Sequence, residues 1–184
     1  MGEQTREYPL VSACGLNCGL CPNHYTKGAF RCPGCGGKDF FNPACAILKC
    51  NARHGAIEFC FLCPEYPCGR YAAADASDSF ITHRNQLRDN AKLQKYGFAA
   101  YQAELWEKME ILQALLDIYN DGRRKSFYCV AVNLLPPQEL RAVMGRLACE
   151  TGDSQTLKEK AKYAALLLGE AAQKAGISLK LRKK

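Results

Sequence analysis

The chain has 184 residues, a formal net charge of +7 and twelve cysteines. This length suits one domain, or one domain with a small appendage, and it allows a sizeable core without disulfides. The opening residues contain no apolar stretch typical of a secretory signal, and no apolar run approaches the ~18 residues that a transmembrane helix needs. We therefore expect a cytoplasmic protein, in which clustered thiols stay reduced and usually bind metal.

Ten of the twelve cysteines lie in the first part of the chain, in two groups of five. These are Cys14, Cys18, Cys21, Cys32 and Cys35, followed by Cys45, Cys50, Cys60, Cys63 and Cys68. After Tyr71 the composition becomes alanine-rich and helix-forming, with the boundary near Ala72 to Ser77. We therefore expect a cysteine-rich metal-binding module at 1–75 and a helical domain at 76–184.

The stretch CPGCG, which begins at Cys32, has the character of a zinc knuckle. Its Pro33 stiffens the turn, and Gly34 and Gly36 allow the backbone to fold around a metal and direct N–H groups at the thiolates. Zinc takes four tetrahedral ligands, typically as two pairs. One site is therefore expected to use Cys18, Cys21, Cys32 and Cys35, with Cys14 as a replacement ligand or a neighbouring thiol. Because each group has five sulfurs, a bridging thiolate, a third metal, ligation shared between the groups or one free thiol per site stay open. Four cysteines of the second group would form another site.

An iron–sulfur cluster is the alternative, because Cys14, Cys18 and Cys21 have the C-x3-C-x2-C spacing of radical enzymes. Such enzymes need a β/α barrel, commonly some ~200 residues, whereas only about 110 mainly helical residues remain here. All-sulfur zinc sites activate water poorly, and none of the common catalytic motifs is present. We therefore expect two or more structural zinc ions and a protein that is not an enzyme. A thiol redox protein is a related alternative.

The histidines and the two remaining cysteines are given smaller roles. His24 and His54 follow cysteines at ligand-like spacings, but sulfur is already in excess, so neither is expected to bind the metal. His83 is expected to be a surface or capping residue. Cys129 and Cys149 stand in apolar surroundings, which favours inert core thiols.

Helices are predicted through most of 76–184 from apolar spacing and end signals. The first begins at Ser77 or Asp78 and ends at Gly97; the second spans 98–120, with Gly122 as its stop. The expected core stripe of the second is Leu105, Met109, Leu112, Leu116 and Tyr119. A third helix is expected to start at Pro136 and Pro137, with a stripe of Leu140, Val143, Met144 and Leu147. A last helix covers 154–174, with a stripe of Leu157, Ala161, Ala164, Ala165 and Leu168.

Two segments carry β-like signals. SFYCVAVNLLPP, 126–137, is either a buried strand or a short buried helix, and periodicity does not decide between them. The final ISLKLRKK alternates apolar and polar residues like a short strand before a basic tail. The fold class expected is α-rich, with small irregular or β elements and short strands, and with a zinc module packed on the helical domain.

The cysteine pattern resembles a known prokaryotic family. The series CGLNCGLCP, CPGCG and CAILKCNARHGAIEFCFLCPEYPCGRY is similar to the family filed as domain of unknown function 3795, over about 13–71. All ten clustered cysteines match its pattern. The segments GRRKSFYCVAVNLLP and ISLKLRKK resemble its longer members. The resemblance implies metal binding, with zinc as the metal, and carries no activity over to this chain.

The excess positive charge lies mainly in the helical domain, at +6 of the +7. Arg123, Arg124 and Lys125, together with Lys180, Arg182, Lys183 and Lys184, are candidate contacts for nucleic acid or an acidic protein. Runs of charged residues of this length more often belong to a solvated loop and tail that bind no partner. The expected function is that of a non-catalytic binding or adaptor protein, and a nucleic-acid-binding zinc protein is the second alternative.

Overall fold

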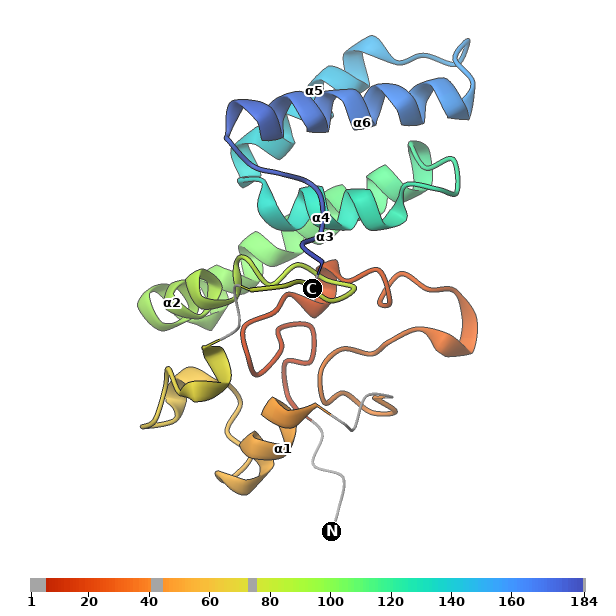
Figure 1. The fold of residues 1–184 in the computed structure, drawn as a ribbon. Helices are drawn as coiled ribbons and strands as arrows, with labels where there is room; N and C mark the ends of the chain where they lie inside the picture. The colour runs from red at the N-terminus through yellow and green to blue at the C-terminus, as the bar shows by residue number, and fades with distance from the viewer. Residues whose placement is uncertain (1–5, 41–44, 73–75, 184) are drawn as a thin grey trace.

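The computed structural model describes residues 6–40, 45–72 and 76–183. Three layers succeed one another in Figure 1: helices α5 and α6 at the top, α3 and α4 across the middle, and the cysteine-rich segment with α1 and α2 below. The boundary expected between Ala72 and Ser77 lies partly outside the described residues. One hydrophobic core continues across the layers, because Val11, Leu20 and Phe59 join the helical residues in a single buried cluster.

The central helices α2 (Gln86–Tyr96) and α3 (Phe98–Ile118) meet at Gly97. Gly97 has φ +80°, a backbone conformation that residues with a Cβ avoid, so it ends one helix and allows the next to begin in a new direction. The predicted stripe of α3 is confirmed in its centre, where Leu105 and Leu112 are buried. Met109 and Leu116 pack at the edge of the same core.

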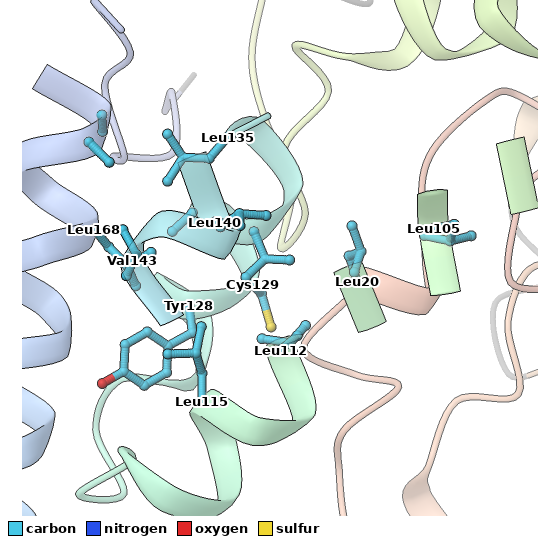
Figure 2. Packing of buried hydrophobic residues seen from close by; sticks show 14 of the residues in the cluster. Leu20, Leu105, Leu112, Leu115, Tyr128, Cys129, Leu135, Leu140, Val143 and Leu168 are labelled. Atoms are coloured by element: carbon cyan, nitrogen blue, oxygen red, sulfur yellow. The ribbon is translucent and has the colours of Figure 1, made fainter. Parts of the chain in front are cut away.

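The segment 126–137, for which the sequence did not decide between strand and helix, lies mainly in helix α4 (Lys125–Leu134). Its apolar residues form a nearly continuous run because the helix is enclosed, with buried residues from Tyr128 to Leu134. The hydroxyl of Tyr128 donates to the carbonyls of Tyr119, at 2.7 Å, and Ala161. Figure 2 shows the sulfur of Cys129 beside Leu112, so this cysteine is part of the core as expected. Cys149 is exposed, so the same expectation for it is wrong.

Helices α5 (Pro137–Glu150) and α6 (Leu157–Lys174) cover the other face of α3 and α4. Pro137 begins α5, as predicted. Thr156 caps α6 by accepting from the backbone N–H of Glu159, whose carboxylate accepts from the N–H of Thr156 in return. Leu157 was expected in the core of α6, but it is 49% exposed, because the first turn extends beyond the layer below.

The described residues contain α-helices and 3-10 turns and no β-strand, so the predicted short strands are wrong. The tail that was expected to form one is held by long-range contacts instead. Asp78 donates its backbone N–H to Arg182 O at 2.9 Å, and its carboxylate accepts from the backbone and the guanidinium of Arg182. Arg84 donates to the carbonyls of Ser178 and Lys180.

The same contacts explain why α2 starts later than predicted. The carboxylate of Asp78 accepts from the backbone N–H of His83 at 2.8 Å and binds the tail, which holds 78–85 as a loop. Helix α2 therefore begins only at Gln86. Among the helices of the described residues, none is long and apolar enough to cross a membrane.

The cysteine-rich segment is built from short turns. Its elements are η1 (Cys18–Leu20), η2 (Gly28–Phe30), α1 (Ala46–Arg53), η3 (Cys60–Leu62) and η4 (Gly69–Tyr71). Turn η1 contacts both α3 and α4, with Leu20 fully buried between them. This contact places the first cysteines directly on the helical layers.

Candidate metal centre

Two C-x2-C pairs share the same backbone geometry. Each wraps a 3-10 turn, η1 or η3, in which the second cysteine donates its N–H to the carbonyl of the first: Cys21 to Cys18 at 3.1 Å and Cys63 to Cys60 at 3.0 Å. In each case a proline follows, and the residue three positions on returns its N–H to the second cysteine, from His24 to Cys21 and from Tyr66 to Cys63. The two cysteine groups therefore contain the same local backbone turn.

One set of thiols gathers Cys14, Cys18, Cys35 and Cys45, which we call the first thiol set. Burial raises the pKa of Cys18 well above its usual value, and the charges of Cys35 and Cys14 raise it further. Burial also raises the pKa of Cys35, and Cys14 and Cys45 act in the same direction. The four thiols are thus electrostatic neighbours, although they come from three separate turns.

Polar groups around the first thiol set favour the thiolate form. The hydroxyl of Ser12 lies 3.0 Å from Cys14 Sγ, and hydrogen bonds from the Leu16 backbone and the Gln86 side chain oppose the effect of burial on the pKa of Cys14. The backbone of Cys35 similarly stabilises the Cys18 thiolate. Such donors to sulfur are the second shell that thiolate metal sites use.

Glycines make this packing possible at two positions. Gly34 has φ +105°, and a Cβ there would lie 2.3 Å from the carbonyl oxygen of Pro9. That carbonyl accepts the N–H of Cys35 at 2.8 Å, so the close approach positions the cysteine. Gly15, at φ +89°, similarly leaves no room for a Cβ between Cys14 and the side chain of Asn90. Gly15 after Cys14 and Gly34 before Cys35 are therefore required by close contacts with Asn90 and Pro9.

The second thiol set lines a cavity of about 30 Å³. It comprises Cys50, Cys60, Cys63 and Cys68, accompanied by His54, Tyr66 and Tyr71 among others. A cavity of this size holds one small ion or water. Burial raises the pKa of Cys60 to about 11; Tyr71 donates a hydrogen bond that opposes the rise, and the charges of Cys14, Cys68 and Cys50 add to it.

Cys21 and Cys32 form a third grouping on the side facing α4. Burial raises the pKa of Cys21, which is opposed by hydrogen bonds from the backbone of Asn23 and His24, and Cys32 raises it further. Burial raises the pKa of Cys129 to about 12, and the charge of nearby Cys21 contributes to the rise. The charge of Cys21 also raises the pKa of Cys18, and the charge of Cys45 raises those of Cys14 and Cys35. The expected site of Cys18, Cys21, Cys32 and Cys35 therefore stays a prediction, and Cys45 of the second group also acts on thiols of the first.

Arg6 is a residue of this centre that the sequence did not reveal. Its guanidinium donates to the carbonyls of Val11 and Cys35, at 2.8 and 3.0 Å, and to the carboxylate of Glu58 at 2.8 Å. The Arg6 side chain is only 6% exposed, and its charge lowers the pKa of Cys35. A buried arginine clamped to backbone carbonyls therefore offsets negative charge on the thiols. Only long-range contacts identify it.

A buried polar network holds the first cysteine turn on the helices. Asn17 donates to the carboxylate of Asp89 at 2.8 Å and accepts from the hydroxyl of Tyr101 at 2.7 Å. Lys108, which is also buried, has its pKa lowered to about 8 by burial, against the opposing charges of Glu104 and Asp89. Because Asn17 immediately precedes Cys18, this network fixes the position of the turn that carries the thiol.

The three histidines lie in different surroundings, and the expectation that His24 and His54 bind no metal stays a prediction. His24 is buried; its Nδ1 lies 3.0 Å from the carbonyl of Cys32, and Arg31 Nη2 lies 3.2 Å from its Nε2. His54 lines the cavity of the second set. His83 lies 3.1 Å from the hydroxyl of Ser79.

The donor chemistry of both thiol sets suits a metal that prefers sulfur. All twelve cysteines are free thiols. Within 6–40, 45–72 and 76–183, no three His, Cys, Asp or Glu side chains are arranged as a ready coordination shell. To bind one ion, the four thiols of a set would therefore have to turn toward a common centre. Protonated thiols do not attract one another, whereas a bound ion attracts all of its ligands.

Comparison with known proteins finds one family whose pattern matches this segment. The family described as "Protein of unknown function (DUF3795)" matches residues 10–73, which span all ten clustered cysteines. The resemblance expected from the motif is therefore confirmed over this segment. No curated protein and no solved structure matches the chain.

Proposed function

We propose that the chain is a zinc-binding protein in which two thiolate sites stabilise the cysteine-rich segment. The first thiol set would hold one ion and the second set another. The observation that carries this proposal is the gathering of four cysteines around one small cavity, Cys50, Cys60, Cys63 and Cys68. The four cysteines that line this space supply as many sulfurs as structural zinc takes as ligands.

The surroundings of the sites favour a structural role over catalysis. Catalytic zinc keeps a position open for water and uses histidine or carboxylate ligands, whereas each set here offers four sulfurs. Zinc bound by four thiolates contributes to folding, because the unfolded chain has no preformed site. The role that follows is a metal-stabilised binding or adaptor protein.

Metal analysis tests this proposal directly. The full chain is expressed and purified without added metal, and zinc, iron and acid-labile sulfide are measured per mole of protein. About two zinc ions per chain and a colourless protein are expected. Absence of metal would refute the proposal. A brown protein that absorbs near ~400 nm and contains iron and sulfide would show an iron–sulfur protein instead.

A further inference from the structure

The loop between Cys21 and Cys32 projects an aromatic side chain flanked by cations. At its tip Phe30 is 82% exposed, and Lys27 and Arg31 stand on either side in the sequence TKGAFR. Figure 1 shows this orange loop extending to the side of the molecule, below the turn that joins α3 and α4. A phenylalanine with so much exposed surface contributes little to the core and is available to stack against a partner.

Two hollows adjoin this loop. One, of about 640 Å³, lies between the loop and the α3–α4 turn and is lined by residues that include Lys27, Arg31 and Lys125. The other, of about 580 Å³, is lined by Phe30, Arg31 and Lys38 among others. Arg31 lines both hollows, so they meet at this residue. A ligand that follows the surface would pass Lys125, Arg31 and Phe30 in turn.

The cations of the first hollow are free to bind anions. Within the described part of the chain, Lys27, Arg31 and Lys125 form no ion pair with a carboxylate, and Lys125 donates only to the hydroxyl of Thr26, at 3.4 Å. The single carboxylate lining this hollow, Asp117, accepts from the amide of Gln113 at 2.9 Å. The hollow therefore carries net positive charge.

Buried groups hold these cations in place. The neutral ring of His24, whose pKa is lowered by burial and by Arg31, donates from Nδ1 to Cys32 O and accepts from Arg31 at Nε2. The guanidinium is thereby oriented at the rim. Lys125 lies close enough to Cys21 to lower the pKa of that thiol. The base of the loop and the hollow are thus parts of one structure.

We propose that this surface binds single-stranded nucleic acid. Lys27, Arg31 and Lys125 would contact successive phosphates, and Phe30 would stack on a base. Binding sites for single strands combine such a cationic path with exposed aromatic rings. An acidic peptide would use the cations but would gain no stacking on Phe30. The other cations expected from the sequence are placed differently: Arg124 pairs with Asp121, and Arg182 binds Asp78.

Fluorescence anisotropy with labelled oligonucleotides tests the proposal on the full-length protein. Mixed-sequence DNA and RNA strands of about 12 nucleotides are titrated at about 50 mM and about 200 mM salt. Phe30→Ala is expected to weaken binding about 5- to 150-fold. Replacing Lys27, Arg31 and Lys125 together by alanine should weaken binding at low salt by at least about tenfold and reduce the salt dependence by about two released counterions.

Matched variants separate this surface from general charge and general hydrophobicity. Lys158→Ala with Lys162→Ala removes two exposed charges from α6, and Phe80→Ala removes another exposed phenylalanine, 53% exposed. Both should bind like the wild type. Zinc content and the helical circular dichroism signal are compared among all variants. Both should be unchanged, because the replaced side chains are exposed except that of Lys125, which is half-buried at the start of α4.

Three results would overturn the proposal. The first is absence of binding to either strand at low salt. The second is binding to a duplex as tight as binding to a single strand. The third is binding that is lost with the cations but unaffected by Phe30→Ala and equalled by a polyglutamate peptide, which would show a surface for acidic proteins. None of these outcomes depends on which metal the thiols hold.

Discussion

The side-chain amide of Asn90 donates a hydrogen bond to the backbone carbonyl of Cys14 at 2.9 Å. Asn90 is fully buried on α2, and Gly15 packs directly against it. The first cysteine turn is therefore seated on the helical part of the molecule by a contact between residues 76 positions apart in the sequence. The thiol of Cys14 owes its position to a helix that contributes no cysteine.

We expect Asn90→Ala to lower the free energy of unfolding by about 1–3 kcal/mol, because the buried carbonyl of Cys14 loses a donor. Urea denaturation of the zinc-loaded protein measures this change. Gln94→Ala on the exposed side of the same helix serves as the control and should change stability by less than about 0.5 kcal/mol. Equal effects of the two substitutions would show that the Asn90 contact does not contribute.

Gly34→Ala should be strongly destabilising. A Cβ at this position would strain a residue with φ +105° and would meet the carbonyl of Pro9, so a loss of more than about 2 kcal/mol is expected in thermal or urea unfolding. Gly145 offers a matched test in α5, where a Cβ meets no atom within 4 Å. Gly145→Ala should stabilise the protein by about 0.5–1 kcal/mol. Destabilisation by both changes would contradict the stated role of Gly34.

Acid stability should depend on Asp78. Burial raises the pKa of this carboxyl, but hydrogen bonds from Arg182 and from the backbone of His83 outweigh burial and lower the pKa to about 2. A depressed pKa stabilises the folded state above the unfolded pKa of about 3.9, and this contribution, about 2 kcal/mol, is lost as the pH falls toward 2. The unfolding free energy of the wild type should therefore fall between about pH 4 and pH 2.

Asp78→Asn is the matched variant for this pH dependence. It should be less stable than the wild type at neutral pH, and the difference between the two proteins should shrink below about pH 4. Unfolding is followed at a series of pH values on both proteins. A difference that is independent of pH would show that the Asp78 carboxylate is not the group responsible.

Removing metal should loosen the cysteine-rich segment more than α5 and α6. Chelation takes away the proposed ligand-to-ion bonds, whereas the buried Leu147 and Leu168 belong to the helical core. Hydrogen exchange with mass spectrometry, with and without a strong zinc chelator, should show faster exchange within 10–73 and little change in α5 and α6. A segment that keeps its protection and leaves its thiols unreactive after chelation would contradict structural zinc.

Single cysteine replacements should separate the two thiol sets. Cys18→Ser is expected to reduce the bound zinc by about one ion through loss of the first set, and Cys60→Ser should do the same through the second. Cys149, which is exposed on α5, belongs to neither set, so Cys149→Ser should leave the zinc content unchanged. Loss of all metal from either Cys18→Ser or Cys60→Ser would show one shared cluster instead of two sites.

The helices were largely predictable because their signals are local. Gly97, Pro137 and the end of α6 at Lys174 were read from residues within one or two turns of each boundary. The start of α2 could not be predicted from local residues, because Asp78 is held by Arg182 from the far end of the chain. For the same reason the alternation in the tail did not produce a strand: its backbone groups are bound by Arg84 and Asp78 and do not pair with a second strand.

The amino-acid sequence by itself determined which residues are metal-ligand candidates and where most helices begin and end, since cysteine spacing and apolar periodicity act over a few residues. Only the tertiary structure showed which thiols act on one another across the two groups, with the charge of Cys45 raising the pKa of Cys14 and Cys35, and with Cys21 and Cys32 on the α4 side. It also brought Lys125 to the loop of Lys27 and Arg31. These relationships depend on Asn90, Arg6 and Gly34, whose contacts join segments far apart in the chain, and no local pattern encodes such a contact.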